Sequence, residues 1–162
     1  MDQMTLFKPP YRYIIDTSSI LSQKPNEQHR RQVYKSLWKK IDEYIRGGII
    51  VSCSEVVEEI KDDNIKEWIY SQQCRVLDID NEIQLNVKKI VSENPKMIEF
   101  TNGGGGSSSG DAFLIATAMK YELIIITEEN PDKPTKIPQI GKSYGIEVVN
   151  ITGLCDKEHW EF

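Results

Sequence analysis

The chain alternates between short apolar runs and longer segments whose apolar residues recur at helical spacing. The short runs are rich in Ile and Val, and most lie next to Gly, Asn, Asp or Ser, which is typical of buried strands. We predict strands at residues 13–15, 49–51, 75–79, 123–127 and 146–151. We predict helices at residues 29–46, 54–63, 64–73, 81–94, 112–122 and 137–145.

Two helix boundaries follow from local signals. In the segment 29–46, Val33, Leu37 and Ile41 recur every fourth residue, and the Gly pair at 47–48 ends the helix. The pattern Ser52-x-x-Glu55 is typical of a capping box and predicts that Ser52 opens the next helix.

Strands and helices alternate along the whole chain, and the strand runs are continuously apolar rather than alternating. Both features favour an α/β fold in which a mainly parallel sheet of about five strands carries helices on both faces. A length of 162 residues fits one domain, and we predict a single domain over residues 1–162.

One segment, residues 103–110, consists only of Gly and Ser and is expected to form a flexible loop. Its purity is typical of a designed linker that replaces a natural loop, and a natural flexible loop is the alternative. The native sequence at this position would decide between the two.

Acidic residues follow two of the predicted strands. Asp16 ends the first strand, and Glu128 and Glu129 come directly after Thr127 at the end of the fourth. In an open parallel sheet, ligands bind beyond the carboxyl ends of the strands. If the two strands are neighbours, these carboxylates therefore converge.

Two further segments bring acids toward the same end of the sheet. Asp111 opens the Ala-rich helix before the fourth strand, and Glu58 and Glu59 lie on the helix after the second. A cluster of carboxylates repels itself unless a cation binds, and Mg²⁺ or Mn²⁺ suits oxygen ligands. Each acid also has an ordinary interpretation, since Asp16 and Asp111 can cap helices and the glutamates can be solvated.

Composition narrows the functional class. A net charge of −5 argues against non-specific coating of nucleic acid, though it leaves room for a local basic patch. Three cysteines without CxxC spacing favour neither a disulfide framework nor a zinc site. Without a secretory signal or an apolar run of about 20 residues, we expect a cytoplasmic protein that does not enter the membrane.

The acids lie in motifs that resemble those of PIN-domain nucleases. The stretch "YIIDTSSIL" resembles the first motif of that family, "VVEEI" the second, and "GDAFLIATAMKYELIIITEE" the third and fourth. The four occur in the family's order and cover nearly the whole chain. The chain is most similar to small VapC-type PIN proteins, the toxins of toxin–antitoxin pairs.

The resemblance implies a PIN-like three-layer sandwich and metal-binding, catalytic roles for Asp16, Glu59, Asp111 and Glu129. Glu59 is preferred to Glu58 because it directly precedes an aliphatic residue. The fourth position is usually Asp, so the choice between Glu129 and Glu128 stays open. Supporting roles, such as orienting a carboxylate, fall to Thr17, Ser18, Thr127 and Glu128.

The activity implied is hydrolysis of RNA phosphodiester bonds with Mg²⁺ or Mn²⁺, by the toxin of a type II toxin–antitoxin pair. The resemblance also implies a cognate antitoxin protein as partner and a homodimer. The alternatives are a non-catalytic PIN-fold domain that binds RNA or protein, a phosphoacceptor receiver domain and a DNA flap nuclease. A receiver domain would carry paired acids early in the chain, and a flap nuclease would be longer.

Cations for an RNA substrate are expected on the helix at 29–46. There Arg31, Lys35 and Lys39 recur every fourth residue and form a candidate RNA-binding row. The alternative is a solvated face opposite the apolar stripe. The two histidines, His29 and His159, are expected at the surface.

Overall fold

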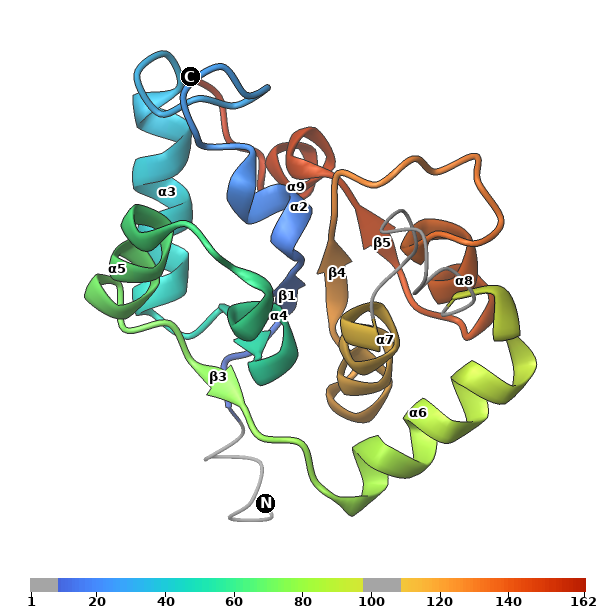
Figure 1. Cartoon of the computed structure of the whole chain (residues 1–162). Helices are drawn as coiled ribbons and strands as arrows, with labels where there is room; N and C mark the ends of the chain where they lie inside the picture. The colour runs from blue at the N-terminus through green and yellow to red at the C-terminus, as the bar shows by residue number, and fades with distance from the viewer. Residues whose placement is uncertain (1–8, 98–108) are drawn as a thin grey trace, which may run out of the picture.

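The computed structural model describes residues 9–97 and 109–162, and within them five parallel strands form one sheet (Figure 1). The spatial order is β3-β2-β1-β4-β5. The strands are β1 (Tyr13–Ile15), β2 (Ile50–Cys53), β3 (Val76–Leu77), β4 (Ile124–Ile126) and β5 (Val148–Val149). The prediction of an α/β fold with a parallel sheet is confirmed.

The first strand, β1, lies at the centre of the sheet, and later strands are added on both sides of it. From β1 the chain adds β2 and then β3 on one side, whereas β4 lies on the other side of β1 and is followed outward by β5. Ile15 of β1 pairs with Ile126 of β4, so these two strands end side by side. The point between β1 and β4 is therefore the topological switch point, where open α/β sheets bind their ligands.

Helices cover both faces of the sheet, as predicted. On one face α4, α7 and α8 pack against the strands, and α6 packs along α7 (Figure 1). On the other face lie α3 and α9. The helices are α2 (Thr17–Leu21), α3 (Lys35–Arg46), α4 (Ser54–Glu59), α5 (Asp63–Ser71), α6 (Asn81–Glu93), α7 (Ser109–Tyr121), α8 (Ile137–Ser143) and α9 (Ile151–Glu158), with the 3-10 turn η1 (Pro95–Met97).

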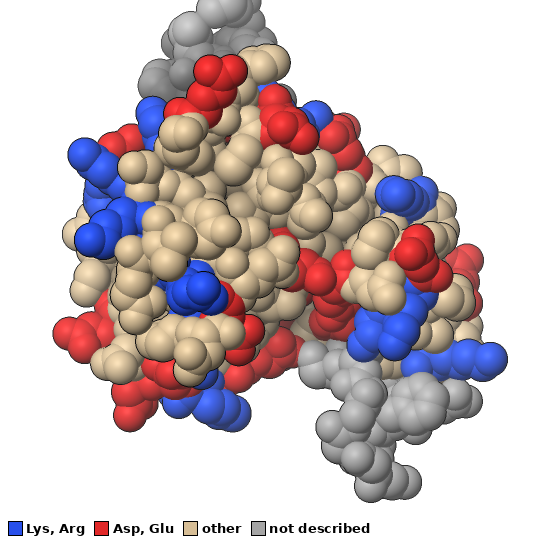
Figure 2. Space-filling model, turned by 90° about the horizontal axis from the view of Figure 1, so that it is seen from above, with Lys and Arg blue, Asp and Glu red and all other residues tan. Residues whose placement is uncertain are grey.

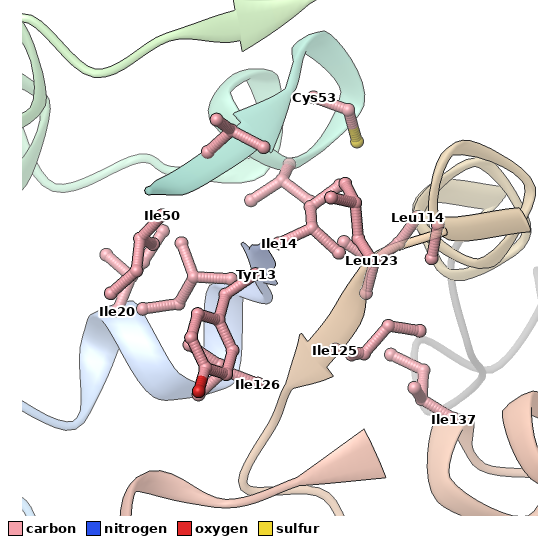
Figure 3. Packing of buried hydrophobic residues seen from close by; sticks show 14 of the residues in the cluster. Tyr13, Ile14, Ile20, Ile50, Cys53, Leu114, Leu123, Ile125, Ile126 and Ile137 are labelled. Atoms are coloured by element: carbon pink, nitrogen blue, oxygen red, sulfur yellow. The ribbon is translucent and has the colours of Figure 1, made fainter. Parts of the chain in front are cut away.

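The core is built on the alternation of side chains along β1 (Figure 3). Tyr13, Ile14 and Ile15 are each 1% exposed or less, because the central strand is covered on both faces. Trp38 of α3 is completely buried on one face, and Leu114 of α7 on the other. A strand buried on both sides has no solvent-facing position, which explains the unbroken apolar run in the sequence.

The predicted helix at 29–46 begins later than expected. Residues 29–34 form turns and irregular structure, and α3 starts at Lys35. The N–H groups of His29 and Arg31 donate to carbonyls of Ser22 and Gln23, which holds this segment against the turn after α2 rather than in a helix. The prediction that Val33 lies on the apolar face of this helix is wrong, because Val33 precedes α3 and is 60% exposed.

The predicted capping box is also wrong. Ser52 lies inside β2, and its Oγ donates to the carbonyl of Ile15 on the neighbouring strand at 3.4 Å. The helix that follows is capped by Cys53 without a side-chain hydrogen bond and ends at Glu59. Ser52 adopts the strand conformation rather than capping a helix, because both faces of Ile50–Cys53 are buried in the sheet.

Two more predicted elements, both in the second half of the chain, have different bounds in the structure. The predicted strand at 146–151 is only two residues long, and Ile151 begins α9 after the cap residue Asn150. The helix predicted at 112–122 starts earlier, at Ser109. Residues 103–108 of the predicted Gly/Ser loop lie outside the described residues, whereas its last two residues open α7.

The two outer strands, β3 and β5, are each two residues long. Both flank longer central strands, so the sheet narrows toward its edges. Within the two described ranges, no helix is long and apolar enough to cross a membrane.

Candidate metal and catalytic site

Asp16 follows β1 and is 4% exposed. Its Oδ2 accepts hydrogen bonds from the hydroxyls of Ser18, at 2.7 Å, and Thr127, at 2.8 Å. It precedes α2 but makes no side-chain capping bond, so the capping interpretation does not explain it. Burial raises the pKa of the Asp16 carboxyl above its ordinary value, although both hydroxyls favour the ionised form.

The adjacent residues Glu58 and Glu59 lie in different environments. The Thr17 hydroxyl donates to Oε2 of Glu59 at 3.0 Å, which joins the end of α4 to the start of α2. Glu59 is half-buried, whereas Glu58 is exposed. Of this pair, Glu59 is therefore the residue that belongs with Asp16.

Asp111 lies in the first turn of α7 and is 6% exposed. Burial is the main cause that raises its pKa to about 8, and the nearby carboxylates of Glu129, Asp16 and Glu59 act in the same direction, while Lys136 opposes them. These interactions place Asp111 in the same electrostatic group as the other three acids.

Glu129 and Glu128 point to different partners. Oε1 of Glu129 accepts from the N–H of Ile137 at the start of α8, at 3.0 Å. Burial raises the pKa of Glu129, and Asp16 and Glu59 contribute, while the Ile137 N–H and Lys136 lower it. Glu129 is thus the fourth acid of the cluster.

Glu128 instead binds the start of α9 and a hydroxyl of α2. Its Oε2 accepts from the N–H of Ile151 at 2.9 Å and from the Ser19 hydroxyl at 3.3 Å. Its Oε1 lies 3.9 Å from Nδ1 of His29. His29 is 7% exposed, so the expectation that it lies at the surface is wrong, because its ring packs between Tyr34 and Ser22.

We call Asp16, Glu59, Asp111 and Glu129 the carboxylate site. They come from the end of β1, the end of α4, the first turn of α7 and the residues after β4. Figure 2 looks onto the carboxyl ends of the strands and shows acidic side chains gathered in a hollow of this face, with basic side chains beside it. The site therefore lies at the switch point of the sheet.

The donor set suits a hard divalent cation. Carboxylate oxygens are the preferred ligands of Mg²⁺ and Mn²⁺. A cation would offset the burial and the mutual repulsion that raise the pKa values of Asp16, Asp111 and Glu129. In the part of the chain that the structure describes, no three acids, cysteines or histidines already stand close enough to form a finished metal centre. Mg²⁺ commonly binds through one or two carboxylates and several waters, so three assembled side chains are not required.

The predicted RNA-binding row does not lie on one helical face. Arg31 precedes α3, and its guanidinium makes a bidentate ion pair with Asp42, with N–O distances of 2.7 and 3.0 Å. It also lies over the rings of Trp38 and Trp68. The Arg31 side chain is therefore occupied by contacts within the protein, whereas Lys35 and Lys39 are exposed.

Comparison with known proteins gives a family match and several solved structures with a similar fold. The family described as "Domain of unknown function (DUF4411)" matches residues 13–162. A crystal structure of PAE2754 from Pyrobaculum aerophilum is similar, with a TM-score of 0.54 and 12% identity over 91% of this chain and 89% of that chain. No curated protein sequence is significantly similar.

A second similar structure is that of FitAcB from Neisseria gonorrhoeae. Its TM-score is 0.51, with 15% identity over 86% of this chain and 98% of that chain. At these identities the likeness concerns the fold alone. Together with the sheet order and the helices on both faces, it agrees with the PIN-like sandwich that the sequence motifs imply.

Proposed function

We propose that this chain, which belongs to the DUF4411 family, is a metal-dependent ribonuclease that hydrolyses RNA phosphodiester bonds. The observation that carries the proposal is the carboxylate site itself. Four acids from four separate elements interact electrostatically at the switch point of a PIN-like sheet. Separate structural roles for these acids would not require that they meet.

The side chains around the site would hold the carboxylates in place for a cation. Ser18 and Thr127 fix the orientation of Asp16, and Thr17 does the same for Glu59. The first N–H of α8 holds one oxygen of Glu129. When bound, Mg²⁺ or Mn²⁺ supplies an acidified water and neutralises the charge of the phosphate.

The biological role that we propose is that of the toxin in a type II toxin–antitoxin pair. The support is the resemblance of the sequence motifs to VapC-type proteins, together with the PIN-like fold. An antitoxin partner and a homodimer follow from the same resemblance.

A second candidate is a PIN-fold domain that binds RNA or protein without cleaving. The observation that favours it is the acid type at the fourth motif position, which is Glu129 here rather than the Asp usual in PIN-domain nucleases. The retention of an acid at all four motif positions favours the nuclease.

The proposal is tested by incubating the protein with total cellular RNA in Mn²⁺ or Mg²⁺ and, in parallel, in EDTA. We expect discrete fragments with either cation and none in EDTA. If calorimetry shows that Mn²⁺ binds but no RNA is cut, the non-catalytic candidate is favoured. If no metal binds, the carboxylate site is not a metal site and the proposal fails.

Adjacent glutamates offer a matched test of which residue acts. We expect Glu59→Gln to lower the cleavage rate by about a hundredfold or more, because it removes one charge that would hold the cation. Glu58→Gln makes the same change on an exposed side chain and should stay within about twofold of the wild type. Equal losses in the two variants would contradict the assignment of Glu59.

A further inference from the structure

Lys136 is an unfavourable residue for its local position. It is the N-cap of α8, where its backbone is extended and its side chain makes no hydrogen bond to the helix. Helix N-caps favour Ser, Thr, Asp or Asn, and the positive end of the helix dipole repels a cation. Neither preference is met by a lysine. The positive charge at this position is therefore explained by something outside α8, as is common at functional sites.

The carboxylate site lies next to Lys136. Oε1 of Glu129 accepts a hydrogen bond from the N–H of Ile137, the residue after Lys136, at 3.0 Å. Glu129 thus satisfies the first N–H of α8 in place of the N-cap side chain. Lys136 is half-buried, and the buried residues Ile137 and Pro138 fix the start of α8 against the rest of the protein. The lysine is therefore held beside the site by packed backbone.

The charge of Lys136 acts on two of the four acids. It favours the ionised carboxylates of Asp111 and Glu129, and so it opposes the burial that raises the pKa of both groups. Among the main causes that shift the pKa of Asp16, Asp111 and Glu129 in the described part of the chain, Lys136 is the one lysine or arginine. It is thus a cation built into an acidic group.

This charge bears on how many metal ions the site can hold. When all four acids are ionised, they and Lys136 together carry a net charge of −3 instead of −4. Two divalent cations would exceed that negative charge, whereas one does not. The ammonium would also repel a second divalent ion at the same group of carboxylates. The balance of charge therefore favours a single ion.

We infer that Lys136 takes the place of a second metal ion, so that the carboxylate site holds one divalent cation. The inference rests on the proposed function and adds to it the number of ions and a positioned cation from the chain itself. In hydrolases with two metal ions, the pair stabilises the attacking and the leaving oxygens. A lysine fixed beside a single ion supplies the second positive charge.

The inference is tested by calorimetric titration of the protein with Mn²⁺ alone. The wild type should bind one Mn²⁺ per chain. Lys136→Met keeps much of the side-chain length but removes the charge, and it should bind Mn²⁺ about tenfold or more tightly because a repelling charge is lost. Lys136→Arg keeps the charge and should stay within about threefold of the wild type. Lys133→Met removes an exposed charge three residues earlier and should do the same.

Thermal unfolding in EDTA separates this role from a purely local one. If Lys136 affected only α8, Lys136→Met would raise Tm, because the repulsion between the ammonium and the helix dipole would be lost. If Lys136 balances the carboxylates, Lys136→Met should lower Tm in EDTA, and Lys136→Arg should restore it. Saturating Mn²⁺ should then raise Tm more in Lys136→Met than in the wild type.

The outcomes for Lys136 and for the proposed function are separate. Two Mn²⁺ ions per wild-type chain, equal affinities of the wild type and Lys136→Met, or a higher Tm of Lys136→Met in EDTA would overturn the inference. If Mn²⁺ binding follows the expected pattern but no RNA is cut, the inference stands and the hydrolase proposal fails. If RNA is cut and Lys136→Met binds Mn²⁺ as the wild type does, the hydrolase proposal stands and the inference fails.

Discussion

Asp111→Asn is expected to lower RNA cleavage by about a thousandfold or more and, in EDTA, to stabilise the fold. The loss of activity follows because the amide keeps the shape of the side chain but cannot supply the negative charge that holds a divalent cation. The gain in stability follows from the same carboxylate, which is buried near three others. One substitution should therefore move activity and stability in opposite directions.

The sign of the stability effect depends on pH. Burial and the neighbouring carboxylates raise the pKa of Asp111 to about 8 in the folded protein, from an ordinary value of 3.8. The folded state therefore holds a proton that the unfolded state releases, and metal-free stability falls as pH rises from about 4 to about 8. The amide in Asp111→Asn cannot ionise, so the variant avoids this loss, which amounts to a few kcal/mol at most.

Thermal unfolding in EDTA at pH 5 and pH 8 measures this effect. The difference in Tm between Asp111→Asn and the wild type should be larger at pH 8. The control Asp156→Asn removes an exposed carboxylate from α9. Its Tm at both pH values and its cleavage rate should equal those of the wild type. A lower Tm for Asp111→Asn at pH 8 would show that Asp111 stabilises the metal-free fold, contrary to this expectation.

Glu158→Ala is expected to lower the free energy of unfolding by about 2–4 kcal/mol, because it leaves two phenol groups without their acceptor. Glu158 ends α9, and its carboxylate accepts from the hydroxyls of Tyr13, at 2.5 Å, and Tyr44, at 2.6 Å. It also pairs with Arg12 at 2.9 Å. This one side chain therefore ties α9 to β1 and α3.

The matched control is Glu161→Ala, which removes an exposed carboxylate three residues later. Urea unfolding at pH 7 should show a loss for Glu158→Ala and almost none for Glu161→Ala. Although burial acts to raise the pKa of Glu158, the two tyrosines and Arg12 outweigh it and lower the pKa. The stabilising effect is therefore lost as pH falls through this lowered pKa, so the two variants should converge in strong acid. A constant gap down to low pH would contradict the role of the ionised carboxylate.

The sequence pattern indicates toward which end of the sheet the acids lie. A buried central strand has apolar residues on both faces, and Asp16 breaks that pattern at the end of β1. The rule that ligands bind at the carboxyl ends of strands then linked Asp16 with the residues after Thr127. It required that β1 and β4 be neighbours, which the structure confirms.

The choice between paired glutamates needed the structure. Glu128 and Glu129 are adjacent and of one type, so no local pattern separates them. The separation comes from distant N–H groups, since Ile151 binds Glu128 while Ile137 binds Glu129. Contacts between residues far apart in the sequence leave no periodic signal.

Local signals failed where tertiary contacts competed with them. Ser52 and Glu55 fit a capping box, but burial between neighbouring strands keeps Ser52 in β2. Arg31 fits a helical row with Lys35, but Asp42 and two tryptophan rings hold it outside the helix. The start of α9 has no clear sequence signal, because Val148, Val149 and Ile151 form an apolar run typical of a strand, in which Asn150 alone marks the start of a helix.

The two-residue edge strands limit how copies of this chain can join. A neighbouring chain that extends the sheet must pair with unoccupied backbone groups along β3 or β5, and strands this short offer few of them. If the chain forms the homodimer that its resemblance to PIN proteins implies, the contact must therefore be made by helices rather than by a continuous sheet. The same narrow edges leave little template for the strand-to-strand stacking that leads to aggregation.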